Sequence, residues 1–520
     1  MAWCSLTGGP LTVGGPVRAR DQSSRGRTPR HDQRCGRRDR HRRERPGPHS
    51  PCLAALARGG VRTCELLANV IGQRVRRRED PRFITGQGQY VDDLQLPDAL
   101  HLTFVRSPWA HARITGVDTS QATALPNVQV FTAEDVALGK ASPAFIAIDE
   151  QWHRPYLASD KVRFAGEVVA AVLAPSREGS VDAAELVAIE DEPLTAVTDP
   201  AQALTDEVLL FEEAGTNVCL ARPGASTEEE LFDGCQVVAS GTLTSQRISA
   251  CPIEPRATAA RLEGDRLMVW LSTQTPHQDR DGLAAALGLD PEAVRVMAPD
   301  VGGGFGAKGL STEDVLVAWL ARATGKPVRW SETRSENLVA MGHGRAQRIE
   351  FRIGGDRDGA VKALRLSLLQ DAGAYPGIGS FLPNLTALMA SGVYAIDKID
   401  VELKSVVTNT TPTGAVRGAG RPEATQAVER AIDTFAAELA LDSAEVRRRN
   451  FIPPGAFPFT TASGANYDSG DYARALELAL ERAGYEQLRA EQAKRREAGD
   501  TRQLGIGLST YVEITNGVAE

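Results

Sequence analysis

The feature that most constrains the fold of this 520-residue chain is the glycine-rich run Asp300-Val-Gly-Gly-Gly-Phe-Gly-Ala-Lys308. Glycine has no Cβ atom, so a backbone built from it can take positive φ angles and come into direct contact with a ligand. Four glycines within five positions therefore predict a loop that contacts a ligand through its backbone. A tight turn without a ligand is the alternative interpretation. The glycines are Gly302, Gly303, Gly304 and Gly306.

The sequence on either side of this loop predicts a strand before it and a helix after it. Residues 293–298 alternate in the manner of a strand, and Ser311-Thr-Glu-Asp314 is typical of the capping box that opens a helix. Backbone amides in such a loop and at a helix start favour a bound anion, such as a phosphate or an anionic cofactor. The spacing matches neither the Walker loop nor the dinucleotide-binding fingerprint, so it does not indicate an ATP or nicotinamide site.

Three further stretches accompany this loop in a fixed order. They are Leu271-Ser-Thr-Gln-Thr-Pro-His277, Gly414-Ala-Val-Arg-Gly-Ala-Gly-Arg-Pro-Glu423, and Arg449-Asn-Phe-Ile452 followed by Tyr467-Asp-Ser-Gly-Asp-Tyr472. Together with the loop they resemble the large molybdenum subunits of the xanthine oxidase family, which includes aldehyde oxidases and the large chains of aerobic carbon monoxide dehydrogenases. The resemblance runs from about Ile71 to the end of the chain.

This resemblance implies the residues of a cofactor site. Gln274 follows a predicted hairpin and corresponds to a glutamine whose neutral amide contacts a ligand of the molybdenum, and Arg417 corresponds to a residue beside the molybdenum. Read from the residues alone, the alternatives are a turn-capping role for Gln274 and a structural or acid-paired role for Arg417. The resemblance also implies that the metal is held through the pterin and not by a protein side chain. The implied contacts to molybdopterin come from Gly302, Gly303, Gly304, Phe305, Gly306, Gln274, Arg417 and Gly418.

The resemblance and the predicted elements together imply an α+β chain of several domains. Residues 71–200 are predicted to form a hammerhead-type α/β domain, and residues 201–460 a first molybdopterin-binding α+β domain. Residues 461–520 are predicted to begin a second such domain, with one amphipathic helix after Asp471 that continues to Glu497 and a strand from residue 504 to residue 513. A chain of this length can form two or three domains with full cores.

The first 70 residues differ in composition from the rest. Residues 1–64 carry fourteen arginines, no lysine and four acidic residues, a balance of +10, so the remainder carries −18 of the net charge of −8. We expect this Arg-rich segment to be disordered, and we hypothesise that it is not native but results from translation upstream of the true start. A nucleic-acid-binding arm is the alternative, but the acidic body would repel phosphate, so no nucleic-acid partner is expected.

Composition also bears on location and partners. No apolar run reaches the ~20 residues that a membrane span requires, and the seven cysteines include no CxxC pair. We therefore expect a cytoplasmic chain with reduced thiols and no iron–sulfur cluster of its own. The resemblance implies that FAD and [2Fe–2S] are carried by separate medium and small subunits, and that a second copy of the large subunit is present. It also implies molybdopterin in its cytosine dinucleotide form and a small-molecule substrate.

The resemblance implies a molybdenum-dependent hydroxylase that inserts water-derived oxygen into an aldehyde or an N-heterocycle. In the family, carbon monoxide oxidation uses a copper-binding cysteine directly after the loop arginine, where this chain has Gly418. Purine hydroxylases have a glutamate, an arginine and a phenylalanine at positions that are Gly309, Leu385 and Ala419 here. A carbon monoxide dehydrogenase large chain is the alternative within the family.

The C-terminal end bears on activity. In the family, the general base is a glutamate near the end of the second molybdopterin-binding domain, and this chain stops near the start of that domain. Glu513 and Glu520 are the late acids, and neither is placed as that base is. We therefore expect a C-terminally truncated chain that does not turn over by itself. An inactive cofactor-binding or assembly protein is the alternative from another class.

Overall fold

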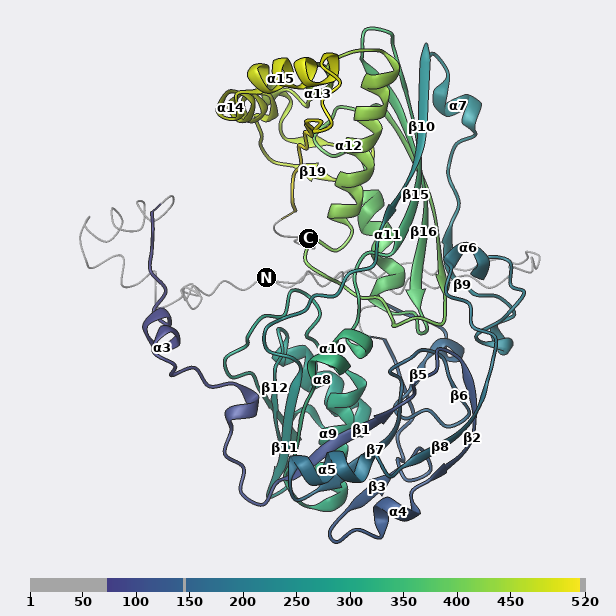
Figure 1. Ribbon diagram of the computed structural model, residues 1–520, viewed down its shortest axis with the longest axis vertical. Coiled ribbons are helices and arrows are strands. Elements are labelled where there is room, and N and C mark those ends of the chain that lie inside the picture. The colour runs from purple at the N-terminus through teal and green to yellow at the C-terminus, as the bar shows by residue number, and fades with distance from the viewer. Residues whose placement is uncertain (1–72, 144–145, 515–520) are drawn as a thin grey trace, which may run out of the picture. The chain divides into compact units, whose positions relative to one another are not determined.

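The computed structural model of the protein describes residues 73–143 and 146–514 (Figure 1). The Arg-rich segment 1–70 lies outside the described residues, so the predictions made for it stay predictions. The described residues 73–88 belong to a unit separate from the main body and hold the short helix α3 (Asp80–Ile84), with Pro81 in the first turn. The main body begins at Gln89.

A seven-stranded mixed sheet joins strands that are far apart in the sequence. Its strand β1 pairs in parallel with β14, the middle strand of the sheet, with Leu100 opposite Val328, and antiparallel with β7 on its other side. The sheet therefore combines the region before residue 200 with the region after it. In spatial order the strands are β13 (Val294–Met297), β12 (Arg266–Leu271), β11 (Ala257–Glu263), β14 (Val328–Ser331), β1 (Leu100–Arg106), β7 (Val168–Ala174) and β3 (Gln129–Phe131).

Helices α8 (Pro276–Leu287) and α9 (Thr312–Thr324) pack on this sheet and contribute to its core, and α5 (Arg177–Ala184) packs against β1 and β7. In α8 and α9, apolar side chains at helical spacing point toward the strands, and Leu283, Leu316 and Leu320 are fully buried there. The Ser311 side chain accepts a hydrogen bond from the amide of Asp314, and the Asp314 side chain accepts one from the amide of Ser311. The predicted strand, glycine loop and capped helix are therefore confirmed.

A five-stranded sheet forms the second core of the main body. Helix α12 (Arg421–Glu438) lies along β10 and β15, and its buried Ile432 and Phe435 belong to the same apolar cluster as Phe351 and Leu364 of the sheet (Figure 1). The helix carries Pro422 in its first turn, as predicted from the sequence. In spatial order the strands are β10 (Val237–Ser245), β15 (Gln347–Gly355), β16 (Val361–Gly373), β17 (Lys398–Val407) and β9 (Val218–Arg222).

Smaller elements surround these two sheets. The shorter sheets among the described residues consist of β6 (Lys161–Val162), β2 (Ala112–Asp118) and β8 (Ala188–Pro193); β4 (Lys140–Ala141) and β5 (Arg154–Pro155); and β18 (Phe459–Thr460) and β19 (Asn466–Tyr467). The remaining α-helices are α4 (Ser120–Thr123), α6 (Pro200–Ala203), α7 (Glu228–Phe232), α10 (Arg334–Ala340), α11 (Ile378–Leu388), α13 (Ser443–Asn450), α14 (Tyr472–Ala483) and α15 (Tyr485–Glu497).

The last described segment differs from its prediction in two ways. Gly484 takes a φ of 64° and ends α14, so the predicted single helix is two helices. Residues 504–513, predicted as a strand, pair with no strand in the described part of the chain and instead lie along α12 and α13. Arg447 donates a 3.1 Å hydrogen bond to the carbonyl of Leu508, and the Thr510 amide donates to buried Glu429 at 2.9 Å. Side-chain alternation alone cannot distinguish a paired strand from an extended segment that packs on helices.

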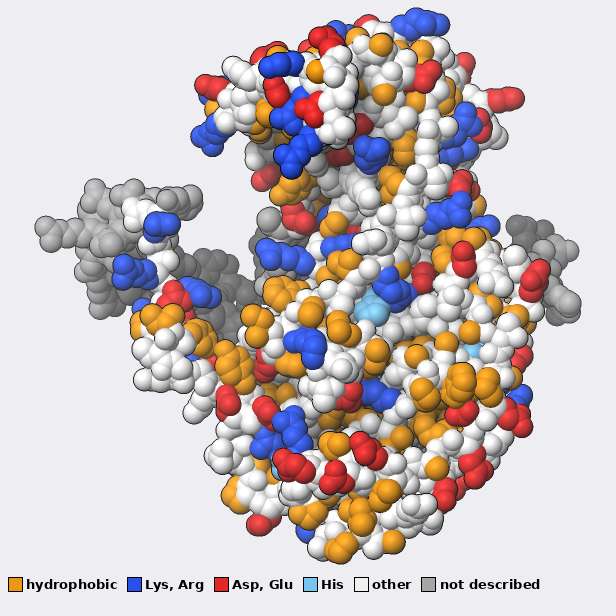
Figure 2. Space-filling view, in the orientation of Figure 1, with side chains coloured by type: hydrophobic (Ala, Val, Ile, Leu, Met, Phe, Trp, Pro, Cys, Tyr) orange, Lys and Arg blue, Asp and Glu red, His pale blue; other side chains and the backbone are white. Residues whose placement is uncertain are grey.

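On the face that Figure 2 shows, acidic, basic and apolar side chains lie intermixed. No helix among the described residues is long and apolar enough to cross a membrane.

A buried ion-pair network connects β1 to the first residues of α9 and α10. Arg256 is 6% exposed and its guanidinium donates hydrogen bonds to Glu313 and Glu332. Arg106, the last residue of β1, donates to Glu313 and Glu336, each at 3.1 Å. Burial by itself would raise the pKa of Glu313, but Arg256 and Arg106 outweigh it and hold that pKa well below its usual value.

The neighbouring carboxyl of Asp314 gives a pH-dependent contribution to stability. Burial raises its pKa from 3.8 to about 6, although Thr258 and Ser311 donate hydrogen bonds to it. Because the folded-state pKa is the higher one, the contribution is fully present below pH 3.8 and is lost as the pH rises through 6. The difference in free energy of unfolding between the wild type and Asp314→Asn should therefore change by roughly 3 kcal/mol across this window. Denaturant titrations from pH 4 to 7 measure it, and parallel curves for the two proteins would contradict the assignment.

Candidate functional site

The glycine loop between β13 and α9 adopts a conformation that side chains would block. Gly303 and Gly306 take φ angles of 98° and 93°, in the left-handed region that favours glycine. A Cβ atom on Gly306 would also lie 2.8 Å from the carbonyl oxygen of Ala415. Phe305 takes a φ of 54° although it is not glycine, and its side chain is 39% exposed. The loop therefore has a fixed, tightly packed backbone that leaves an apolar ring at the surface.

Gln274 lies directly against this loop. It follows β12, and its side-chain Oε1 accepts a 2.8 Å hydrogen bond from the backbone amide of Gly306. Its backbone amide donates to the carbonyl of Lys308 at 3.1 Å. An N–H group needs an acceptor, so the oxygen of the Gln274 amide must face Gly306 and its nitrogen must face elsewhere. Among the described residues, none accepts a hydrogen bond from that Nε2. Gln274 therefore caps the loop with one end of its amide and has a neutral donor free at the other end.

The loop that carries Arg417 is the third part of the site. The amide of Arg417 donates a 2.8 Å hydrogen bond to the carbonyl of Phe305, which joins the two loops. The Arg417 side chain is exposed and makes no ion pair within the described part of the chain, so the acid-paired alternative is not observed there. Gly418 takes a φ of 100°, and a Cβ atom at this position would lie 2.4 Å from Cγ of Pro422.

Residues that the sequence did not single out hold the glycine loop in place. Glu254 Oε2 accepts hydrogen bonds from the amide of Gly302 at 2.7 Å, from Lys308 Nζ at 2.9 Å and from Ser272 Oγ at 2.7 Å. Lys308 is 2% exposed, and burial lowers its pKa although Glu254 opposes this. Glu254 lies in another segment of the chain and no local pattern marks it, whereas the lysine at the end of the glycine run was a signal that could have been followed.

The donors of these three segments fit an anionic cofactor such as a pterin with phosphate groups. Within residues 73–143 and 146–514, nothing accepts a hydrogen bond from the backbone amides of Gly303, Gly304 and Phe305. Gln274 Nε2 adds a neutral donor, and Arg417 adds a cation that is not neutralised by an acid in that part of the chain. A Cβ atom on Gly304 would lie 2.3 Å from Gln274 Oε1, so any larger residue would displace this side chain. The sequence-predicted residues are therefore brought together.

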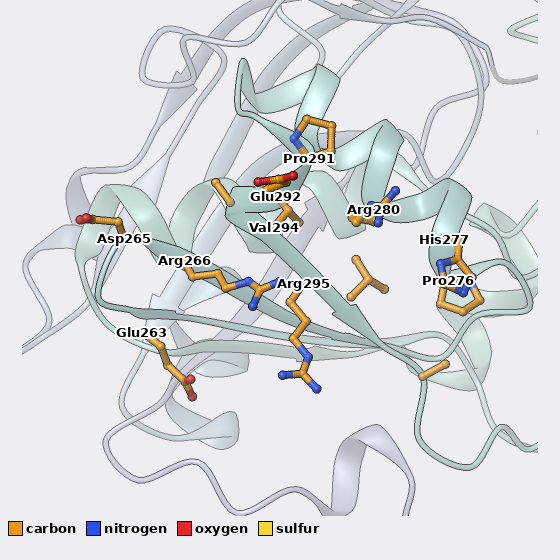
Figure 3. Close-up of a pocket in the computed structure, with 13 residues that line it drawn as sticks. Glu263, Asp265, Arg266, Pro276, His277, Arg280, Pro291, Glu292, Val294 and Arg295 are labelled. Carbon is orange, nitrogen blue, oxygen red and sulfur yellow. The ribbon is translucent and has the colours of Figure 1, made fainter.

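A hollow at the edge of the seven-stranded sheet is distinct from this site. Its volume is about 820 Å³, and it is lined by residues of β12, β13 and the start of α8, among them His277, Arg280 and Arg295 (Figure 3). None of residues 302–306 lines it. The donor-rich loops, not this open hollow, form the candidate functional site.

Glu513, one of the two late acids, also has a defined place. Its carboxylate forms an ion pair with Arg421 at 3.2 Å, and its side chain is 47% exposed. Arg421 is the first residue of α12 and follows the Arg417 loop directly. Glu513 is therefore a surface acid tied to the start of this helix. Glu520 lies outside the described residues.

Sequence models of two protein domains match the chain. The model described as the molybdopterin cofactor-binding domain matches residues 210–451, which include the glycine loop, Gln274 and Arg417. The model described as the aldehyde oxidase and xanthine dehydrogenase a/b hammerhead domain matches residues 85–195.

Individual relatives agree with these matches. The chain is 35% identical over 462 residues to the nicotine 6-hydroxylase large subunit of Paenarthrobacter nicotinovorans, covering 86% of this chain and 56% of that protein. It is 36% identical to the carbon monoxide dehydrogenase large chain of Afipia carboxidovorans, covering 85% of this chain and 58% of that protein. The chain thus spans somewhat more than half the length of these curated relatives.

Two solved structures of related enzymes resemble this chain in both fold and sequence. Quinoline 2-oxidoreductase from Pseudomonas putida 86 superposes with a TM-score of 0.78 at 38% identity, covering 82% of this chain and 56% of that chain. Carbon monoxide dehydrogenase from Oligotropha carboxidovorans superposes with a TM-score of 0.75 at 34% identity, with the same coverage of 82% and 56%.

Proposed function

Because the chain belongs to the xanthine oxidase and aldehyde oxidase family of molybdopterin-binding large subunits, we propose that it is the large, catalytic subunit of a molybdenum-dependent hydroxylase. The members of this family are molybdenum-dependent oxidoreductases. One observation carries the proposal: the glycine loop, Gln274 and the Arg417 loop meet in one place. The reaction proposed is the insertion of water-derived oxygen into an aldehyde or an N-heterocycle.

The proposed roles of the residues follow from their donors. The bound molybdenum cofactor supplies the oxygen-insertion and electron-transfer chemistry. The amides of Gly303, Gly304 and Phe305 seat its anionic part, and Gln274 Nε2 donates a neutral hydrogen bond without adding charge. Arg417 supplies the cation beside it, and Gly302, Gly306 and Gly418 allow the backbone to approach. We propose the cytosine dinucleotide form of molybdopterin.

Electrons from such a site need an acceptor. We propose that they leave through [2Fe–2S] and FAD on a small and a medium subunit, and that the complex contains a second copy of the large subunit. The names of two relatives support separate subunits, since one is a large subunit and another is subunit gamma of a dehydrogenase complex. A cytoplasmic location stays a prediction, based on cysteine usage.

Position 418 supports a hydroxylase over a carbon monoxide dehydrogenase. Glycine has no side chain to bind copper, and a cysteine Cβ in this backbone conformation would lie within 3 Å of Pro422. The relatives named for nicotine and quinoline point toward nitrogen heterocycles, although carbon monoxide dehydrogenases match about as well. We therefore propose an aldehyde or N-heterocycle as the substrate.

The division into domains is also a proposal. We place the boundaries near residues 200 and 460, so that residues 71–200 form the hammerhead domain, residues 201–460 the first molybdopterin-binding domain, and residues 461–520 the start of a second. The ends of the two family matches, at residue 195 and residues 210–451, support this division.

Analysis of the native complex tests the proposed function. We expect bound molybdenum and pterin in the purified complex. Once the chain is extended through a complete second molybdopterin-binding domain that supplies the general base, we expect dye reduction that depends on an aldehyde or an N-heterocycle but not on carbon monoxide. Molybdenum and pterin are measured by elemental analysis and by fluorescence after oxidation. A complex without molybdenum would contradict the cofactor assignment. Copper-dependent oxidation of carbon monoxide would contradict the proposed substrate class. Bound molybdenum without turnover would favour a cofactor-binding or assembly protein.

A further inference from the structure

A short segment before β15 forms the support for the Arg417 loop. The amide of His343 donates to the carbonyl of Pro412 at 3.1 Å, and the amide of Gly414 donates to the carbonyl of His343 at 2.6 Å. Arg345 and Ala346 then take φ angles of 68° and 65°, which cost non-glycine residues roughly 1–2 kcal/mol each. Two consecutive residues in this conformation indicate that the surrounding contacts hold the segment in place.

The strained backbone directs the Arg345 side chain onto the Arg417 loop. Its Nη1 donates to the carbonyl of Val416 at 3.0 Å, and its Nη2 donates to the carbonyl of Arg417 at 2.5 Å. On its other side the guanidinium lies 3.6 Å from the carboxylate of Glu423, in the first turn of α12. The side chain of Arg345 is 11% exposed and that of Glu423 is fully buried. A buried carboxylate needs a counter-charge, and Arg345 lies at ion-pair distance from this one, although neither Glu423 oxygen accepts a hydrogen bond from the described residues.

Both backbone polar groups of Arg417, its amide and its carbonyl, are hydrogen-bonded to other segments. Its amide donates to the carbonyl of Phe305 in the glycine loop, and its carbonyl accepts from Arg345. Its side chain makes no ion pair within the described ranges, so these backbone contacts fix the point from which the side chain extends. We propose that Arg345, fixed by Glu423, is a positioning residue that orients Arg417 toward the anionic cofactor. This inference rests on the proposed function of the site.

Substitutions of Arg345 in the native complex test the inference. In Arg345→Ala we expect bound molybdenum, or kcat at unchanged KM, to fall by about 10–100-fold, as for other residues that orient a metal site indirectly. Arg348→Ala is the matched control, because Arg348 is a nearby arginine whose side chain is 49% exposed and whose ion-pair partner Glu350 lies 3.8 Å away. We expect this control to retain both molybdenum and activity.

Arg345→Lys separates positioning from mere stability. Lysine keeps a positive charge beside Glu423, so we expect the melting temperature of Arg345→Lys to be near that of the wild type. Lysine lacks the planar pair of donors that reaches two carbonyls, so the cofactor content or kcat should still fall. Millimolar guanidinium should partly restore Arg345→Ala, whereas sodium chloride at equal concentration should not.

The outcomes distinguish the two proposals. A wild-type complex without molybdenum would overturn the proposed function itself. A loaded wild type together with an Arg345→Ala variant of equal molybdenum content and equal kcat would overturn the positioning role alone. The same follows if Arg345→Lys loses stability and cofactor together, in parallel with Arg345→Ala, and guanidinium restores neither.

Discussion

The Gly304→Val variant is expected to lose its molybdenum while remaining folded. The φ angle of Gly304 is not positive, so valine imposes no backbone strain of that kind, but its Cβ would lie 2.3 Å from Oε1 and 2.6 Å from Cδ of Gln274. The glutamine side chain must then leave the Gly306 amide and carry its free donor away from the cofactor. Losing one hydrogen bond to a charged group costs roughly 1.5–3 kcal/mol, so molybdenum content should fall about tenfold or more.

A second glycine of the same loop region provides the control. At Gly309 an added Cβ atom would meet only Thr275 Oγ1, at 3.7 Å, which is an ordinary contact. Gly309→Val should therefore retain the molybdenum content of the wild type, and both variants should unfold at similar temperatures. Molybdenum content that is unchanged in Gly304→Val would show that the cofactor does not depend on the place of Gln274.

The Arg256→Met variant is expected to have the largest effect on stability. Methionine fills much of the volume but leaves Glu313 and Glu332 buried without this cation, and both side chains are fully buried. Breaking a buried pair by removing one partner costs about 3–5 kcal/mol in the free energy of unfolding. Denaturant titration at pH 7 measures this change.

Arg261→Met is the matched control for this variant. Arg261 belongs to β11, the strand that follows Arg256, but its side chain is 36% exposed and its partner Glu263 is 46% exposed. Exposed pairs contribute at most about 1 kcal/mol. Equal losses in the two variants would mean that the buried network adds nothing beyond a surface ion pair.

Local chemistry explains how much of the fold could be predicted. The glycine loop, the capping box at Ser311 and the proline at the start of α12 each act within a few residues, and each prediction was confirmed. The α+β class and the succession of a hammerhead and a cofactor-binding domain followed from the family resemblance. The break at Gly484 was missed although glycine in the left-handed region commonly ends helices.

In the candidate site, too, residues within short motifs could be predicted, and residues that act through distant contacts could not. Gln274 and Arg417 were found because short motifs surround them, but their meeting depends on contacts between segments far apart in the sequence. Arg345 and Glu254 were missed because each acts on a loop that is distant along the chain, through a contact that no local spacing reveals. The prediction of a strand after residue 504 was wrong, because its alternation identifies an apolar face but not the partner that covers that face.

The parallel pairing of β1 with β14 has a consequence for synthesis on the ribosome. Leu100 leaves the ribosome long before Val328, and at 5–20 residues per second the delay is on the order of ten seconds or more. During that interval one edge of β1 has no neighbour, and an open strand edge is a template for unwanted association between nascent chains. The part of the sheet before residue 200 can therefore pair β1 with β7 early, but the sheet is completed across β1 only after Val328 has been synthesised.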